Sequence, residues 1–195
     1  LNFLKLTIDS RDSLAVYRLL CAPCFTVADA DLHAFTYLAK KKSLPYYEAL
    51  GRAGELGLSQ SGIGHAHALR ALLEAGAARA RFEKPSIVLY NFLEHSGYLK
   101  YLTHAEIEGN AAAIRQLYHL RDFLGYLEEY EAVTPDATVA GFLEHFKYVS
   151  DSGDRGKISE TSQSPDSVNI LTVHGAKCLE FKYVFVVNLV EERFP

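Results

Sequence analysis

The chain has 195 residues, of which 49% are hydrophobic and 23% charged, and its formal net charge is −4. These values are typical of a globular protein with a real core, and they exclude a strongly basic nucleic-acid coat but not a local basic patch. No apolar run is long enough for a membrane span, and the N-terminus has no signal-peptide pattern.

Cysteine and methionine usage bears on the origin of the chain. The three cysteines, a low and odd number, indicate a reduced, cytoplasmic protein. The chain has no methionine, so we expect a piece of a longer protein whose first residues begin within a helix.

Two helices are predicted near the N-terminus. The first is "DSLAVYRLLCAP", which Asp12 or Ser13 caps and Pro23 ends. Its apolar positions at helical spacing are Leu14, Tyr17, Leu20 and Cys21. The second is "DADLHAFTYLAKKK", with Asp29 as its cap and lysines at the end that the helix dipole favours. Its apolar face consists of Leu32, Phe35, Leu38 and Ala39.

The helical pattern continues around one loop. A short helix is predicted from Pro45, and the glycine-rich segment 51–64 is predicted to be a loop. "HALRALLEAGAARARF" predicts an alanine-rich helix, and "PSIVLYNFLEHSGYLKYL" predicts a helix with a stop at Gly97.

The longest periodic signal covers residues 105–131. Apolar residues recur there every three or four positions, which predicts one continuous helix of about seven turns. A last helix, "TVAGFLEHFKYV", follows Pro135 and places one group of apolar residues on one side: Val139, Phe142, Leu143, Phe146 and Val149.

The composition changes near residue 150. Residues 151–167 are polar and nearly free of apolar side chains, which is typical of a linker. "VNILTV" and "YVFVVNLV" then indicate short buried parallel strands, too few for a stable sheet. The predicted fold class is mainly α: a helical domain over 1–150, a linker over 151–167, and the start of an α/β domain over 168–195.

Two glycine patterns and one cysteine pattern suggest sites, and each has a plainer interpretation. Ile63 stands where a phosphate-binding loop needs lysine, and "SGIG" at 61–64 resembles a DNA-phosphate hairpin only over a stretch that a flexible loop explains as well. Cys21 and Cys24 form a C-x-x-C that closes a helix and lacks two further zinc ligands. We therefore predict two packed, buried thiols and no metal site.

The charged residues of the helical part form small clusters. Lys40–Lys42, and the group Arg79, Arg81 and Lys84, are candidate contacts for a nucleic-acid backbone, and solvated helix ends explain them equally well. The histidines are scattered, and the glutamates of 105–131 are predicted to lie on the surface. No catalytic residue is assigned.

The stretch "TVHGAKCLEF", residues 172–181, carries the densest chemistry. It places a hydroxyl, an imidazole, an ammonium and a carboxylate just beyond the carboxyl end of a predicted strand, the edge where α/β sheets bind ligands. A capped loop with a surface Lys–Glu pair explains the same residues, and chemistry alone leaves both readings open.

The stretch "VNILTVHGAKCLEFKYVFVVNLVEERFP" resembles motif V of the UvrD/Rep/PcrA-like superfamily 1 DNA helicases. The family pattern is T-h-H-x-A-K-G-L-E-F, then V-h and a terminal F-P. The residues in register are Thr172, Val173, His174, Ala176, Lys177, Leu179, Glu180, Phe181, Val184, Phe185, Phe194 and Pro195. Upstream, "DSLAVYRLLCAP", "LPYYEAL", "LEHSGYLKYL" and "TVAGFLEHF" are similar to landmarks of the helical 2B subdomain, so 168–195 would begin the RecA-like 2A motor domain.

The resemblance implies roles for matched residues only. Glu180 would contact the ATP ribose, Thr172 and His174 would lie by the single-stranded DNA backbone, and Lys177 would couple the two sites. A carboxylate accepts from ribose hydroxyls, and a hydroxyl or an imidazole donates to phosphate oxygens. The longer parent would use ATP and Mg²⁺ and act on single-stranded DNA and DNA junctions, with 3′ to 5′ polarity. The chain itself lacks the ATPase motifs, so we expect it to bind no cofactor and to be inactive alone.

Two departures from the family pattern matter. Cys178 replaces the family glycine, which costs on the order of 1 kcal/mol if that position needs a positive φ. The stretch "PCFTVADADL" lacks the Gly-Ile-Gly contact to duplex DNA that many members carry there, so duplex contact by this domain is in question.

Two other functions stay open from sequence alone. A helical module that docks a regulatory protein is the main alternative, and a thiol-dependent metal module is the weaker one. Salt-dependent binding to a single-strand/duplex junction favours the DNA role over the first, and a zinc assay settles the second.

Overall fold

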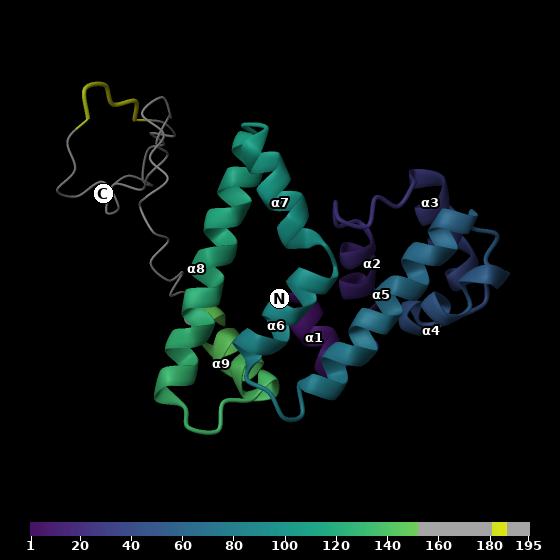
Figure 1. Cartoon of the computed structure of the whole chain (residues 1–195), viewed down its shortest axis with the longest axis horizontal. Coiled ribbons are helices and arrows are strands. Elements are labelled where there is room, and N and C mark those ends of the chain that lie inside the picture. Colours follow the sequence, from purple (N-terminus) through teal and green to yellow (C-terminus); the bar gives the residue numbers. More distant parts are fainter. Residues whose placement is uncertain (152–180, 187–195) are drawn as a thin grey trace, which may run out of the picture. The chain divides into compact units, whose positions relative to one another are not determined.

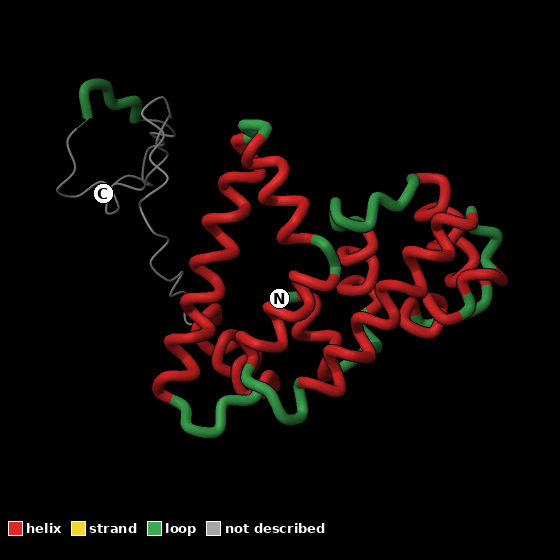
Figure 2. Tube along the Cα trace, viewed as in Figure 1, coloured by secondary structure: helices red, strands yellow, loops and turns green. Residues whose placement is uncertain are grey.

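A computed structural model of the protein describes residues 1–151 and 181–186. Contacts within the chain divide it into two units, Leu1–Ser159 and Glu160–Pro195. Each unit is treated by itself. All regular secondary structure in the described residues is helical and lies in the first unit, which confirms the predicted mainly α character (Figures 1 and 2).

The first half of the helical unit is made of short elements around one long helix. In chain order these are α1 (Asn2–Ile8), α2 (Ser13–Leu20), α3 (Asp29–Lys41), α4 (Tyr46–Gly51), the 3₁₀ turn η1 (Ala53–Glu55) and α5 (Gln60–Arg79). The second half consists of α6 (Pro85–His95), α7 (Tyr98–Ile107), α8 (Ala111–Val133) and α9 (Val139–Asp151).

Capping side chains explain several helix starts. Asp12 accepts a hydrogen bond from the Ala15 N–H at 3.0 Å, so of the two residues predicted to cap this helix, Asp12 does so. Asn110 accepts from Ala112 and Ala113 at the start of α8. Gly97, the predicted stop, adopts φ 75° between α6 and α7.

The short helix α1 lies at the centre of the unit. It packs against α2, α5, α6 and α9. Phe3, 2% exposed, stacks on Phe92 of α6 with ring centroids 3.9 Å apart. A Cβ added to Gly76 of α5 would lie 2.5 Å from Cζ of Phe3, so the missing side chain lets α5 reach α1. Phe3 therefore holds α1, α5 and α6 together.

The predicted face of the last helix is confirmed. Val139 and Phe142 of α9 are fully buried, and Leu143 and Phe146 pack against the same core. Phe142 lies in an aromatic cluster with Phe123, Tyr126 and Tyr130 of α8. This cluster joins α8 and α9.

The continuous helix predicted over 105–131 is wrong. α7 ends at Ile107, Gly109 adopts φ 74°, and α8 begins at Ala111, so the two helices form a hairpin (Figure 1). Its inner side has a small core of its own, made by Leu102, Ala105 and Ala113. The apolar period runs through the turn because both helices face this core, whereas Ile107 is 85% exposed.

Three further predictions need correction. The N-cap of α3 is Ala28 and no side chain caps this helix, so Asp29, the predicted cap, is the first residue inside it. The segment 51–64 is not one loop, because η1 lies within it and α5 begins at Gln60, so Gly62 and Gly64 are helical. The face of α2 is also different: Ala15, Val16 and Leu20 are buried, whereas Leu14 is exposed. The smaller residues Ala15 and Val16 are buried in preference to Leu14, because packing against neighbouring helices decides which side of α2 is buried.

A buried carboxylate of α3 fixes the start of α5. Asp31, 6% exposed, accepts the Ser59 backbone N–H at 2.7 Å and the Ser59 hydroxyl at 2.6 Å. Ser59 Oγ in turn accepts the Gly62 N–H at 3.1 Å. The hydrogen bonds from Ser59 lower the pKa of Asp31, and His65 lowers it further. A Cβ on Gly62 would lie 2.5 Å from Oδ2 of Asp31, so glycine permits this approach.

Of the second unit, the structure describes residues 181–186. They include part of the predicted strand "YVFVVNLV", and residues 183–186 adopt no strand conformation. A strand requires a hydrogen-bonded neighbour, which local sequence does not supply. The predicted strand "VNILTV" and nearly all of the predicted linker, 152–167, lie outside the described residues, so the boundaries at 150 and 167 stay predictions.

The close approach at Gly76 can be tested with a matched pair of helical glycines. We expect Gly76→Ala to destabilise the protein by about 1–2 kcal/mol, because overpacking against Phe3 exceeds the gain in helix propensity. Gly125 of α8 has no atom near its Cβ position, so Gly125→Ala should stabilise by up to about 1 kcal/mol. Urea unfolding followed by circular dichroism measures both. Equal signs for the two changes would refute the packing argument, and Phe3→Leu should relieve the cost of Gly76→Ala.

The Asp31 contact predicts a specific response to acid. Because its folded pKa is lowered, its stabilising contribution is complete above the ordinary carboxyl pKa of about 3.9. That contribution is lost as the pH falls through the lower, folded value. Asp31→Asn should cost about 1–3 kcal/mol at neutral pH, since an amide cannot accept at both ends.

The variant should also lose less stability on acidification than the wild type over that range. Urea unfolding at neutral and at acidic pH measures both effects. Asp29→Asn is the control, because Asp29 lies exposed in the same helical turn. An equal loss in both variants would mean that only the helix dipole is at work.

Candidate functional site

The reactive turn that the sequence singles out lies outside the described residues. Thr172, His174, Lys177, Cys178 and Glu180 all fall within 152–180, so the roles predicted for them stay predictions. Phe181, which follows Glu180, is described and is exposed. The candidate binding residues that the structure describes lie in the helical unit.

The "SGIG" segment lies at the start of α5, where two backbone donors are already occupied. The Ser59 N–H is bonded to Asp31 and the Gly62 N–H to Ser59 Oγ. A phosphate at this helix end would have to displace a buried carboxylate. The same arrangement closes the start of α6, where Glu131 accepts the Ser86 N–H at 2.7 Å and the Ser86 hydroxyl at 2.8 Å. Two helix N-termini thus bind internal carboxylates in place of external anions.

The prediction of two packed, buried thiols is wrong. Cys21 is exposed at the end of α2, and Cys24 is half-buried. Burial raises the pKa of the Cys24 thiol, which a hydrogen bond with Ser96 partly opposes. The turn after α2 brings the Cys21 side chain to the surface. The spacing of the two cysteines in the sequence does not reveal the path of this turn. Within residues 1–151 and 181–186, no three His, Cys, Asp or Glu side chains are placed to hold a metal ion.

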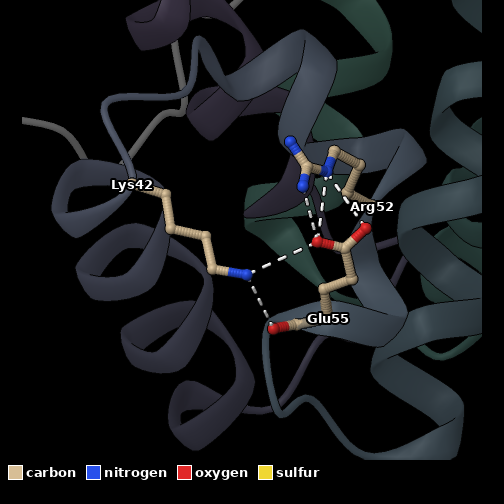
Figure 3. A network of polar contacts seen from close by, with 3 residues as sticks. All are labelled: Lys42, Arg52 and Glu55. Atoms are coloured by element: carbon tan, nitrogen blue, oxygen red, sulfur yellow. Dashed lines mark hydrogen bonds and ion pairs between the residues drawn. The ribbon is translucent and has the colours of Figure 1, made fainter.

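The basic cluster at the end of α3 is partly neutralised. Lys42 Nζ lies 3.5 Å from a carboxylate oxygen of Glu55 and 3.3 Å from its backbone oxygen (Figure 3). Arg52 donates to both oxygens of the same carboxylate, at 2.7–3.2 Å. Lys42 therefore helps to hold η1 against α3. Lys40 and Lys41 remain exposed.

The second basic cluster lies at the turn between α5 and α6. Arg79 donates to Glu83 at 2.9 and 3.2 Å, so this pair is internally compensated. Arg81 and Lys84 are exposed and have no ion pair within the part of the chain that the structure describes. Between them, Phe82 is 90% exposed. The helix predicted from "HALRALLEAGAARARF" includes Phe82, whereas α5 ends at Arg79. The nearby Pro85 is the local signal that the helix has ended before it.

These features make the helical unit a candidate binding surface. Its described ion pairs are surface pairs, which hold local geometry and contribute little stability. Among its cations without a described ion pair, Arg81 and Lys84 lie at the turn between α5 and α6. None of the described helices has the length and apolar character that a membrane crossing requires.

Comparison with known proteins places the chain in a family. The model of the UvrD-like helicase C-terminal domain matches residues 1–195, the whole chain. The chain is 24% identical over 197 residues to the ATP-dependent DNA helicase PcrA of Staphylococcus aureus, and 23% identical over 195 residues to that of Bacillus subtilis. Both matches cover all of this chain.

The matched region is a limited part of those relatives. The chain spans 26% of the length of either PcrA protein. The similarity runs through the helical unit as well as the C-terminal motif, in agreement with the resemblance noted in the sequence. The chain therefore belongs to the UvrD-like helicase C-terminal domain family.

Proposed function

We propose that this chain is the helical 2B-type subdomain and the start of the 2A motor domain of an ATP-dependent DNA helicase. The match of the family model to all 195 residues carries this proposal. The relatives named as ATP-dependent DNA helicases support it. The complete enzyme would couple ATP hydrolysis to movement on single-stranded DNA and to strand separation at junctions, with 3′ to 5′ polarity.

The residues that match motif V would provide the coupling. Glu180 would accept hydrogen bonds from the ribose of ATP, and Thr172 and His174 would contact the DNA backbone. Lys177 would connect the nucleotide to the DNA side. All four stand within ten residues of one another in the sequence, which suits a turn that senses both ligands.

The phosphates of ATP and their Mg²⁺ ion would be held elsewhere in the helicase. The sequence contains no phosphate-binding loop, and the described residues offer no metal-ligand group, so they do not fit this role. Within the chain, only Glu180 is assigned to the nucleotide. A cytoplasmic location belongs to the same proposal, and the free thiols of Cys21 and Cys24 suit a reducing compartment.

The helical unit would contribute binding or regulation. Its α2–α3 connection lacks the Gly-Ile-Gly pattern, and Thr26 adopts a left-handed φ of 46° there. A β-branched residue in this conformation is strained. Its side chain would also keep a phosphate farther from the backbone than a glycine would. This unit would therefore contact DNA through other residues. The family match favours this role over a module that only docks a regulatory protein.

The proposal predicts where ATP hydrolysis resides. The coding sequence upstream of Leu1 should encode a G-x-x-x-x-G-K-[ST] motor domain. The protein made from the combined sequence should hydrolyse ATP faster when single-stranded DNA is added, and the 195-residue chain alone should not hydrolyse ATP. A coupled phosphate-release assay measures both. DNA-stimulated hydrolysis by the chain alone, or the absence of the upstream motif, would contradict the proposal.

The role of Glu180 predicts a defect in nucleotide binding. In the longer protein, Glu180→Gln should raise KM for ATP by about 10-fold, because hydrogen bonds to a charged acceptor are worth about 1.5–3 kcal/mol. The single-stranded DNA concentration that gives half-maximal stimulation should stay within about 2-fold. Glu191→Gln, at a position that the family pattern does not specify, is the control. A change in DNA dependence with an unchanged KM would assign Glu180 to the DNA side.

Cys178 gives a test of the turn itself. If the family glycine serves only to relieve strain, Cys178→Gly in the longer protein should leave ATP turnover unchanged or raise it. Steady-state hydrolysis at saturating ATP and DNA measures this, and Cys21→Ser controls for loss of an exposed thiol. A clear loss of turnover would show that the thiol has a role of its own.

A further inference from the structure

The turn between α5 and α6 exposes an aromatic ring that the fold does not use. Phe82 is 90% exposed, whereas the other phenylalanines of residues 1–151 are buried or half-buried. Burying such a ring would gain free energy, yet the fold leaves it in water. A lone exposed apolar side chain marks no site by itself, but an aromatic ring held in water offers a face on which a nucleobase can stack.

The fold holds this ring outward. The Phe82 N–H donates to the Arg79 carbonyl at 2.9 Å, and the Glu83 N–H donates to the same carbonyl at 2.8 Å. Ala80 and Pro85 are buried on either side and anchor the turn in the core. Glu131 of α8 fixes Ser86, the next residue. The exposure of Phe82 is therefore a property of a well-anchored turn and does not arise from a frayed helix end.

The charged side chains of residues 79–84 carry a net positive charge, and the carboxylate of Glu131 beside them accepts from Ser86. Glu83 pairs with Arg79, which leaves Arg81 and Lys84 as the uncompensated charges of residues 79–84 in the part of the chain described. Because Glu131 accepts the Ser86 N–H at the start of α6, binding of an anion at this turn depends chiefly on these two side chains. A ring flanked by two free cations matches an unpaired base flanked by phosphates.

We propose that the α5–α6 turn, residues 80–84, binds single-stranded nucleic acid. Phe82 stacks on one unpaired base, and Arg81 and Lys84 contact the neighbouring phosphates. The choice of nucleic acid rests on the proposed function. The charge pattern favours the same choice over a protein partner, because a single ring with two like charges offers little apolar area for docking.

The α7–α8 turn supplies a natural contrast. Ile107 there is 85% exposed, but its neighbours Glu106 and Glu108 are acidic. Figure 1 shows the two turns at separate ends of the helical unit. Ile107 is about as exposed as Phe82, but the acidic side chains beside it should repel a nucleic-acid strand. The α7–α8 turn therefore serves as an internal control.

The chain contains no tryptophan, which permits a direct test. Phe82→Trp places a single indole at the turn, and stacking on a base quenches indole fluorescence. Ile107→Trp places the same probe at the control turn. Each full-length chain variant is titrated at low salt with an oligothymidylate strand and, separately, with inorganic polyphosphate, which carries the charge without bases.

The proposal predicts quenching by oligothymidylate in Phe82→Trp, none in Ile107→Trp, and none in either variant with polyphosphate. In anisotropy titrations with the labelled strand, Phe82→Ala should weaken binding by roughly 5- to 100-fold. Removing both Arg81 and Lys84 should reduce the slope of log K against log salt by about 1.4. Circular dichroism checks that each variant is folded.

Several results would overturn the proposal: no binding of the strand at low salt, binding without quenching in Phe82→Trp, or equal quenching at both turns. Quenching by addition of more of the chain itself would indicate protein association in its place. The outcome is separable from the proposed helicase function. DNA-stimulated ATP hydrolysis by the longer protein without quenching at this turn would leave that function intact and refute this contact. Quenching without ATP hydrolysis would do the reverse.

Discussion

The contact between Phe3 and Gly76 is the constraint on which the helical unit depends. α1 has seven residues, too few to be a stable helix alone. It persists because it is enclosed by α2, α5, α6 and α9. Phe3 stacks on Phe92 of α6 and also contacts α5 at Gly76, and α5 can come this close because residue 76 has no side chain. The long helix α5, and with it the α5–α6 turn, is positioned by this approach.

Two side-chain carboxylates also position the helices of this unit. Asp31 holds the start of α5, and Glu131 holds the start of α6. Each ties together segments that are distant in sequence, and each uses backbone donors that a phosphate would otherwise bind. These two backbone donors are therefore not free for an anionic ligand, which leaves exposed cationic side chains as candidates to bind it. Arg81 and Lys84, which flank the exposed ring of Phe82, are such side chains.

Local sequence rules predicted much of the fold. The cap at Asp12, the stop at Gly97 and the buried face of α9 are local features, and the structure confirms them. The rules failed where two helices share one core. The apolar period over 105–131 runs through the turn at Gly109, because α7 and α8 contribute to a common cluster and keep the same spacing. In α2, packing against α1 buries Ala15 and Val16 in preference to Leu14, and period alone carries no information about a partner.

The sequence alone determined the family, because a long motif from Thr172 to Pro195 identifies it residue by residue, and the family model agrees over the whole chain. It also determined the helical class, because helical periodicity and capping are local. The tertiary structure decided which residues are free to bind. Cys21 lies at the surface, Lys42 is held by Glu55, and Phe82 stands in water between Arg81 and Lys84. Exposure and pairing depend on which distant segments meet, and this is set by contacts such as the packing of α1 and the hydrogen bonds of Asp31 and Glu131.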